Sequence, residues 1–468
     1  MDPESPTKSP AVSTTEIEET QSQLEWQVPP RTAKERLSSM AIVAFSAIAL
    51  LSDGYNAQVI GYMNPFFAVL YEGSFTDTLK TRLSNAYLIG EIVGMVGFGV
   101  IIDRIGRKFG IVVATVLLVL GIVLATAAHG KTDTGMFWMM IVGRGVAGVG
   151  AGGEYPVCGT GATEATDESA KGRKYRGFII GMVCDCAIDM GFVAAGIVAI
   201  IVIAAYHENN SSGIWRITFG LGLVLPLCVF YFRLKMINTV QYRKHAMRRR
   251  VPYMLVLKRY WKTMIGTCMT WFMYDFVSYP FGLFSSTIIS QLNPESSVIK
   301  NVGLGTAINS FYIPGCLVGA YLMDKIGRKN TMMAGFFSQA ILGFIIGGAL
   351  KPIQSVVPLF VVLYGIFSAL GEMGPGVSTF LISSESYATP LRGHLLGLSA
   401  AVGKAGAAIG TQVFTPMQNA IGGDDELKGQ QGVFLVGAAF SLVGGLICFF
   451  CVPNVRQLPP GECSVQQY

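Results

Sequence analysis

The sequence DRIGRK at residues 103–108 returns as DKIGRK at residues 324–329, and each copy directly follows a long apolar run. A single match would arise easily by chance, but two copies at corresponding places predict a chain built from two duplicated halves. A central glycine predicts a tight turn, and the Asp can cap a helix end or pair with a basic residue. We therefore expect a hinge latch here and not a substrate site. Its predicted members are Asp103, Arg104, Gly106, Arg107, Asp324, Gly327 and Arg328.

The composition indicates that this chain lies in a lipid bilayer. Hydrophobic residues make up 51% of the 468 residues and charged residues 14%, and the mean hydropathy is +0.49. Soluble proteins carry about 25% charged residues. The 56 glycines are scattered through apolar runs, which favours close packing of membrane helices. The sequence predicts an all-α integral membrane protein.

Twelve apolar runs are long enough to cross the bilayer, for which a helix needs about 20 residues. They lie near 39–62, 84–102, 111–129, 136–158, 176–205, 214–234, 262–290, 302–323, 331–350, 356–383, 393–421 and 431–452. The charged stretch between the sixth and seventh runs divides them six and six. We predict a disordered cytoplasmic tail (1–38), a six-helix bundle (39–234), a cytoplasmic central loop (235–261), a second six-helix bundle (262–452) and a cytoplasmic tail (453–468).

The positions of Lys and Arg predict the orientation. Most of the 35 basic residues fall on one side if both termini are cytoplasmic, as the positive-inside rule requires. The net charge of +6 is then a determinant of topology beside anionic lipid, so no nucleic acid partner is needed to explain it. We expect a multi-pass protein of the plasma membrane that acts as a monomer.

Twelve spans, the repeated motif and GRGVAGVGAGGEYPV in the fourth span resemble the major facilitator superfamily. More closely, the chain resembles the phosphate:proton symporter branch and, within it, the fungal glycerophosphoinositol and glycerophosphodiester permeases. The resemblance covers residues 39 to about 455. It implies a carrier that rocks between two states, is driven by the proton gradient and has one central substrate site between its halves.

Three carboxylates in apolar runs are the predicted proton-coupling groups, because an ionisable group inside the membrane needs a partner or a function. Asp53 matches the first Asp of an Asp-x-Tyr-Asp pattern in the phosphate symporters, although packing against an Arg or an amide would also explain it. Glu154 stands where the resemblance implies Asp in Gly-Gly-Asp-Tyr-Pro. Asp275 lies between Trp271 and Tyr279 in the seventh span.

The predicted phosphate ligands are side chains that donate hydrogen bonds or carry positive charge. Trp271, Asp275 and Tyr279 are spaced four residues apart, which places them close to one helix face. The resemblance adds Tyr55, Tyr155 and Lys404 to the donors Trp271 and Tyr279. Arg144 is expected to bond helix-end carbonyls in preference to substrate.

Departures from the phosphate symporters bear on the substrate. Gly376 replaces an Asn and is expected to open room beside the phosphate. Extra acids could accept hydrogen bonds from the hydroxyls of an inositol or glycerol group; we include Glu372, Asp185 and Asp189 in the substrate site, and note Glu91. Glu385 is alternatively a residue of the cytoplasmic gate, paired with Arg392.

The leading hypothesis is a proton-coupled symporter that imports glycerophosphoinositol or a related glycerophosphodiester. Inorganic phosphate is the alternative substrate, which a Gly376 region filled by other side chains would favour. A nutrient receptor that signals without transport is a hypothesis of a different class, although such receptors usually carry longer cytoplasmic extensions. An enzyme is not expected, since the sequence has no nucleotide loop, metal cluster or nucleophile triad; we expect no cofactor and no metal.

Overall fold

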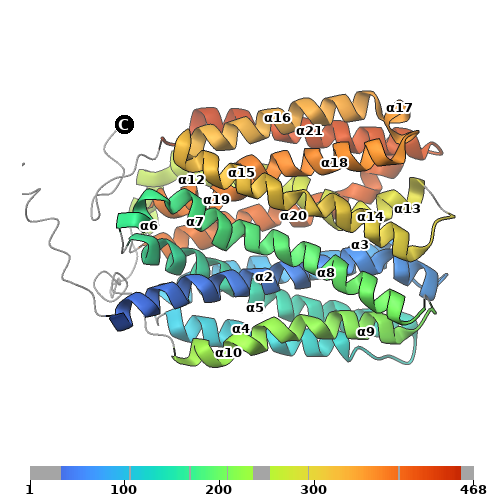
Figure 1. Ribbon diagram of the computed structural model, residues 1–468, viewed down its shortest axis with the longest axis horizontal. Helices are drawn as coiled ribbons and strands as arrows, with labels where there is room; N and C mark the ends of the chain where they lie inside the picture. Colours follow the sequence, from blue (N-terminus) through green and yellow to red (C-terminus); the bar gives the residue numbers. More distant parts are fainter. Residues whose placement is uncertain are drawn as a thin grey trace, which may run out of the picture.

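The computed structural model describes residues 33–104, 107–167, 170–207, 209–235, 253–292, 295–387 and 391–454. Throughout these ranges the regular structure is helical, and the long helices run side by side along one axis (Figure 1). This agrees with the all-α class predicted from the apolar runs.

The first half of the chain supplies the helices drawn in blue to green. They are α2 (Ala33–Leu70), α3 (Asp77–Arg104), α4 (Arg107–Thr126), α5 (Asp133–Asp167), α6 (Ala170–Lys174), α7 (Arg176–Ile180), the π-helical turn η1 (Gly181–Cys186), α8 (Ala187–Ala205), α9 (Ser212–Gly220), the 3-10 turn η2 (Leu221–Leu223) and α10 (Val224–Lys235).

The second half supplies the helices drawn in yellow to red. They are α12 (Tyr253–Leu283), α13 (Ser285–Leu292), α14 (Val298–Ser310), α15 (Tyr312–Lys325), α16 (Arg328–Gly348), α17 (Leu350–Gln354), α18 (Val357–Gly371), the π-helical turn η3 (Glu372–Gly376), α19 (Val377–Glu385), α20 (Arg392–Gly422) and α21 (Glu426–Cys451). Each of the twelve apolar runs has a helical counterpart, and several spans are interrupted by a short break or a π turn.

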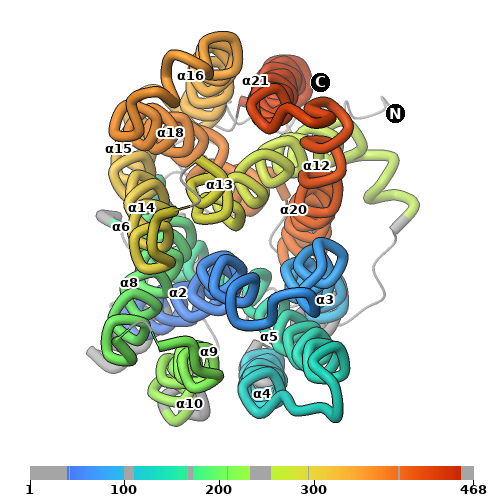
Figure 2. Tube along the Cα trace, turned by 90° about the vertical axis from the view of Figure 1, so that its right-hand side faces the viewer, coloured from blue at the N-terminus to red at the C-terminus, as the bar shows by residue number. Residues whose placement is uncertain are grey.

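The two halves form two groups of helices that face each other in the end-on view (Figure 2). The contact between them is made by a few helices: α3 packs on α20, α2 on α13 and α14, α8 on α14, and α7 with η1 on α15. A site between the halves must therefore be lined by these helices and by those next to them.

Six helical segments in the described part of the chain are apolar and long enough to cross a membrane by composition alone, for example 176–205 and 426–451. The long helices α2, α3, α5, α12 and α20 contain the buried charged residues Asp53, Glu91, Arg144, Glu154, Asp275 and Lys404. Their polar residues lower the hydropathy of the spans that surround the centre of the protein.

A charged latch joins the halves at one end, which we call the Asp324 end. Both carboxylate oxygens of Asp324 accept hydrogen bonds from the first turn of α7, from the backbone N–H groups of Gly177 and Phe178, each at 2.9 Å. The N-terminus of a helix carries partial positive charge, which favours this contact. Gly327 has a φ of 90°, a left-handed conformation that suits glycine, and begins the turn into α16.

Glu385 belongs to the same latch. Its carboxylate forms ion pairs with Arg328 at 3.2 Å and with Arg176 of the other half at 3.3 Å, and its pairing with Arg392 stays a prediction. Arg176 was not predicted. Of the first motif copy, Gly106 and the side chains of Asp103, Arg104 and Arg107 lie outside the described part of the structure.

Neutral hydrogen bonds join the halves at the opposite end. The amide of Gln58 donates to the backbone carbonyl of Gly282 at 2.8 Å, beside the break between α12 and α13. Asn309 donates to the Tyr62 hydroxyl at 2.9 Å, and Asn85 donates to Gln412 at 2.9 Å. Contacts between the halves therefore bridge both ends of the described structure.

Arg144 fastens three helices of the first half. Its guanidinium donates to the backbone carbonyls of Leu83 on α3 at 3.0 Å and of Asn56 and Ala57 on α2 at 3.1 and 3.4 Å. A planar group with several fixed donors can serve three acceptors at once, which an ammonium on a flexible stem does poorly. Arg144 therefore holds α5 against α2 and α3 and does not line the central cavity.

This geometry predicts that Arg144→Lys lowers the stability of the protein by about 1–3 kcal/mol, because buried carbonyls lose a partner. The measurement is the thermal unfolding midpoint of the purified protein in detergent. Arg82→Lys is the matched control, since Arg82 is exposed and stacks over Trp138. Equal midpoints for Arg144→Lys and the control would contradict the assignment.

Candidate functional site

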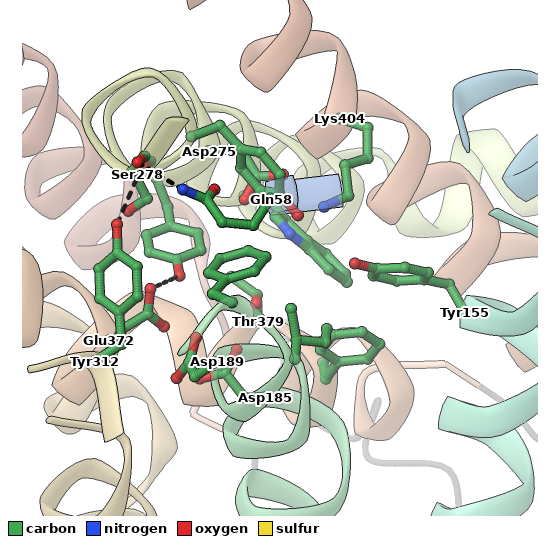
Figure 3. A pocket seen from close by; sticks show the side chains of 17 residues that line it. Gln58, Tyr155, Asp185, Asp189, Asp275, Ser278, Tyr312, Glu372, Thr379 and Lys404 are labelled. Atoms are coloured by element: carbon green, nitrogen blue, oxygen red, sulfur yellow. Dashed lines mark hydrogen bonds between the residues drawn. The ribbon is translucent and has the colours of Figure 1, made fainter. Parts of the chain in front are cut away.

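A cavity lies between the two halves and is lined by side chains from both of them (Figure 3). The first half contributes side chains from α2, α5, η1 and α8, and the second half contributes side chains from α12, α15, η3, α19 and α20. The side chains that line it include Gln58, Tyr155, Asp185, Asp189, Phe192, Trp271, Tyr274, Asp275, Tyr279, Tyr312, Glu372, Phe380 and Lys404.

Lys404 is a cation in the wall of this cavity and is 2% exposed. Its ammonium nitrogen lies 3.8 Å from a carboxylate oxygen of Glu91 on α3. The same nitrogen lies 3.8 Å from the ring centre of Tyr279 and 5.0 Å from that of Tyr155, so aromatic faces cover it on two sides. The central site thus has one positive charge that is only partly neutralised by a direct ion pair.

The glycines beside Lys404 explain how this helix comes so close to α12. A Cβ atom on Gly403 would lie 2.4 Å from the Trp271 ring, and one on Gly406 would lie 2.3 Å from the backbone oxygen of Phe272. Neither distance leaves room for a side chain. The Gly-Lys-x-Gly pattern thus lets α20 pack directly on α12 and fixes Lys404 near Asp275.

Three buried carboxyl groups belong to the region of Lys404: Asp53, Glu91 and Asp275. Asp53 accepts a hydrogen bond from the hydroxyl of Tyr87 at 2.8 Å. Both oxygens of Glu91, one of Asp53 and one of Asp275 have no hydrogen-bond donor among the described residues. Three carboxylates around one ammonium leave an excess of negative charge in a region that excludes water. Protonation of one or more of them would relieve it.

Hydrogen-bond donors adjoin the same side of the cavity. The hydroxyl of Tyr155 is buried and has no partner among the described residues, and it points toward Lys404 in Figure 3. Trp271 lines the cavity one helical turn from Asp275, and its ring packs against Phe380. One cation and several neutral donors form the kind of surface that binds an anion such as phosphate.

Acidic side chains line a different side of the cavity (Figure 3). Asp185 and Asp189 come from η1 and α8 of the first half, and Glu372 comes from η3 of the second half. Glu372 accepts a hydrogen bond from the hydroxyl of Tyr274. One oxygen of each of the three carboxyl groups has no hydrogen-bond donor in the described structure. This acidic side, unlike the Lys404 side, is rich in acceptors.

Glu154 does not lie at this site, contrary to the prediction. Its side chain is buried on another face of α5, where the hydroxyl of Thr115 on α4 lies 3.4 Å from its carboxylate. Its neighbour Tyr155 faces the cavity. The carboxylate that joins Asp53 and Asp275 around Lys404 is Glu91, whose only signal in the sequence was an isolated acid in an apolar run.

Two predicted substrate contacts are also absent from the cavity wall. The hydroxyl of Tyr55 donates to the backbone carbonyl of Thr218 at 2.6 Å and so joins α2 to α9. Gly376 opens no room: a Cβ there would lie 2.1 Å from a Glu372 oxygen, 2.9 Å from the Tyr274 hydroxyl and 3.1 Å from an Asp185 oxygen. Other side chains already fill this space.

Several residues of the cavity were not predicted. The wall includes the aromatic side chains of Phe192, Tyr274 and Tyr312, and Gln58 bridges to the second half. Tyr312 and Phe192 pack edge to face, with ring centres 6.0 Å apart. In a span that is apolar on every face, the sequence does not reveal which aromatic residues turn inward.

One possible group of metal ligands adjoins the acidic side. Asp185, Asp189 and the thiol of Cys316 each bring one ligand atom within 4.8 Å of the others. Zinc accepts both thiolate and carboxylate ligands, but three buried groups near one another do not by themselves make a metal site. We assign no metal to this group.

Comparison with known proteins places the chain in a transport family. The profile of the family described as "Sugar (and other) transporter" matches residues 41–251 and again 235–463. Two matches of similar length agree with the duplication seen in the repeated motif.

Related proteins of similar sequence are named as transporters or permeases. The chain is 40% identical to glycerophosphoinositol permease 1 of Candida albicans, over 90% of this chain and 80% of that protein. It is 39% identical to glycerophosphoinositol transporter 1 of Saccharomyces cerevisiae, with the same coverage. A probable inorganic phosphate transporter of Arabidopsis thaliana is 23% identical over 91% of this chain and 93% of that protein.

Solved structures show the same fold. A proton:xylose symporter of the major facilitator superfamily superimposes with a TM-score of 0.75 at 16% identity and covers 91% of this chain and 98% of that chain. These relatives and structural neighbours are transporters and not enzymes. The chain is therefore a multi-pass membrane protein of the sugar (and other) transporter family, within the major facilitator superfamily.

Proposed function

We propose that this protein is a proton-coupled symporter that imports glycerophosphoinositol or a related glycerophosphodiester across the plasma membrane. It would act as a monomer with both termini in the cytoplasm, which makes the Asp324 end the cytoplasmic end. The observation that carries the proposal is the cavity itself, which has a cation and neutral donors on one side and unpaired acceptors on another. The relatives named for glycerophosphoinositol transport support the choice of substrate.

The phosphodiester group would bind on the Lys404 side. Its monoanion matches the single positive charge of Lys404, and the free hydroxyl of Tyr155 can donate to a phosphate oxygen. Trp271 and Tyr279 add an indole N–H and a phenol from the neighbouring helix face. Hydrogen bonds in which one partner is charged are stronger than neutral ones, so this side would contribute most of the binding energy.

The alcohol part of the diester would then extend to the acidic side. Hydroxyl groups of an inositol or glycerol are donors, and Asp185, Asp189 and Glu372 each offer an oxygen that has no donor in the described structure. A trimethylammonium group has no hydrogen to donate. This side therefore favours polyhydroxylated alcohols over choline by hydrogen bonding, although a cation would gain electrostatic attraction there.

Coupling to protons would follow from the competition for Lys404. When Asp53, Glu91 and Asp275 are ionised, they neutralise Lys404 and repel an incoming phosphate. When protons bind to them, the Lys404 charge becomes available to the anion and the carboxyl groups become donors. Binding of proton and substrate would thus favour each other, and neither would be released easily before the carrier turns to the cytoplasm.

Inorganic phosphate is the second candidate because of Gly376. The space around this glycine is filled by Glu372, Tyr274 and Asp185, which was the condition expected to favour the smaller substrate. Against it, the cavity also has an acidic side, lined by Asp185, Asp189 and Glu372, which would repel a phosphate. A substrate with both an anionic and a hydroxylated part uses both sides.

The first test is uptake of labelled glycerophosphoinositol by liposomes that contain the purified full-length protein. We expect accumulation above equilibrium when the outside is acidic and loss of accumulation when the proton gradient is collapsed. Unlabelled glycerophosphoinositol should compete more strongly than glycerophosphocholine, and inorganic phosphate least. Stronger competition by phosphate would select the second candidate, and binding without uptake would indicate a receptor.

The second test concerns Asp275. We expect Asp275→Asn to abolish accumulation driven by the proton gradient, because the amide cannot exchange a proton, while exchange of labelled for unlabelled substrate continues at a comparable rate. Both processes can be measured in the same liposomes at two pH values. If the variant keeps the pH dependence of the wild type, Asp275 is not a coupling residue.

The third test separates two buried glutamates. Glu91 pairs with Lys404 and Glu154 does not lie at the site, so Glu91→Gln should reduce accumulation to simple equilibration while Glu154→Gln should keep it. The measurement is the ratio of internal to external substrate at steady state. Equal losses in the two variants at matched protein levels would contradict the assignment of coupling to Glu91.

A further inference from the structure

Two carboxyl groups from opposite halves meet at the acidic side of the cavity. Asp185 lies in η1 of the first half and Glu372 in η3 of the second, and both side chains are buried, with residue exposures of 7% and 2%. A Cβ atom added to Gly376 would lie 2.1 Å from Glu372 Oε2 and 3.1 Å from Asp185 Oδ2. The two facing oxygens therefore border the same small space beside Gly376.

The two facing oxygens lack a donor. Asp185 Oδ2 and Glu372 Oε2 are both without a hydrogen-bond partner in the described structure, whereas Glu372 Oε1 is served by the Tyr274 hydroxyl. No ion pair links either acid to a cation among the described residues. Lys404, the cation of the cavity, pairs with Glu91. Two ionised carboxylates this close, buried and without a cation, would repel each other strongly.

One proton resolves both problems. A proton on either carboxyl group removes one negative charge and donates a hydrogen bond to the facing oxygen of the other group. Two carboxyl groups that lie side by side can hold one proton between them, and that proton then belongs to the pair and not to either residue. The free oxygen atoms of Asp185 and Glu372 thus identify the missing donor as a proton.

We propose that Asp185 and Glu372 form a second proton-binding site, shared between the two halves and complete only when the halves are closed on each other. It is distinct from the carboxyl groups around Lys404. Because it uses two of the oxygens that would accept substrate hydroxyls, a bound alcohol group would compete with the shared hydrogen bond. Opening the acidic side to water would separate the pair, hydrate both groups and release the proton. Binding of this proton therefore stabilises the closed state.

The surroundings of the pair also lack positive charge. The titratable groups that face it in the described structure are Asp189, Tyr274, Asp275, Cys186, Tyr312 and Cys316. Each of these is neutral or negative. Any that ionises strengthens the requirement for the shared proton, so low pH should favour the closed state and high pH should oppose it.

Infrared absorption by the purified full-length protein in liposomes can detect this proton, since the carbonyl stretch of a protonated carboxyl group differs from that of a carboxylate and shifts in heavy water. We expect Asp185→Asn and Glu372→Gln each to remove the same band, because the new amide donates to the remaining carboxylate in place of the proton. The double variant should lose no more than that one band.

Two further variants keep the test informative if a single substitution unfolds the protein. Gly376→Ala retains both acids but places a methyl group against Glu372, so the shared band should move to the position of an isolated carboxyl group. Asp189→Asn removes a neighbouring acid that does not bridge the halves and should leave the shared band in place.

The proposal is wrong if both single variants keep the band, or if the double variant loses two. Exchange of labelled glycerophosphoinositol, measured in the same liposomes, tests the proposed substrate separately. Failure of exchange with the expected infrared result would overturn the substrate and leave the shared proton established.

Discussion

An ammonium group buried at the centre of a membrane protein is the constraint on which the site depends. Lys404 is surrounded by helices, is almost fully buried and pairs directly with Glu91. An isolated charge in such a place would be very costly, so acids from three different helices lie around it. When all three acids are ionised, their negative charge exceeds the positive charge of Lys404, and a proton or another cation is needed to balance it. A site that is electrostatically complete only when a small cation joins it is a natural place for coupling.

The architecture could be predicted from the sequence because it depends on composition over long runs. Twelve apolar runs and the two copies of D-[RK]-I-G-R-K are features of many residues, and each run corresponds to helix in the structure. The latch could be foreseen in part, since the Asp324 carboxylate binds the N-terminus of another helix, α7, as an Asp is able to do. Its partners Gly177 and Phe178, and Arg176, which pairs with Glu385, lie in the other half and could not be predicted from local sequence.

The residues of the site were harder to predict, because an apolar helix gives little sign of which face turns inward. Glu154 and Tyr155 are adjacent, yet only Tyr155 reaches the cavity. Tyr55 lies two residues from Asp53 and bonds a carbonyl on α9. At Gly376 the sequence suggested empty space, because a glycine has no side chain. In the structure this space is filled by Glu372, Asp185 and the hydroxyl of Tyr274. On α12 the spacing of four residues correctly predicted that Trp271, Asp275 and Tyr279 share one helix face, and all three line the cavity.

The break between α12 and α13 has a consequence for the mechanics of the carrier. One carbonyl, that of Gly282, accepts hydrogen bonds from Gln58 at 2.8 Å, from Ser285 at 2.9 Å and from Asn309 at 3.4 Å. When the first half moves away, Gln58 leaves but two donors from the carbonyl's own half remain, so the acceptor is never stranded in a dry interior. At the Asp324 end, Asp324 and Glu385 keep Arg328 of their own half, but their contacts with Arg176 and the N-terminus of α7 are broken. The joint beside Gly282 therefore parts without separating opposite charges, whereas the joint at the Asp324 end does separate them.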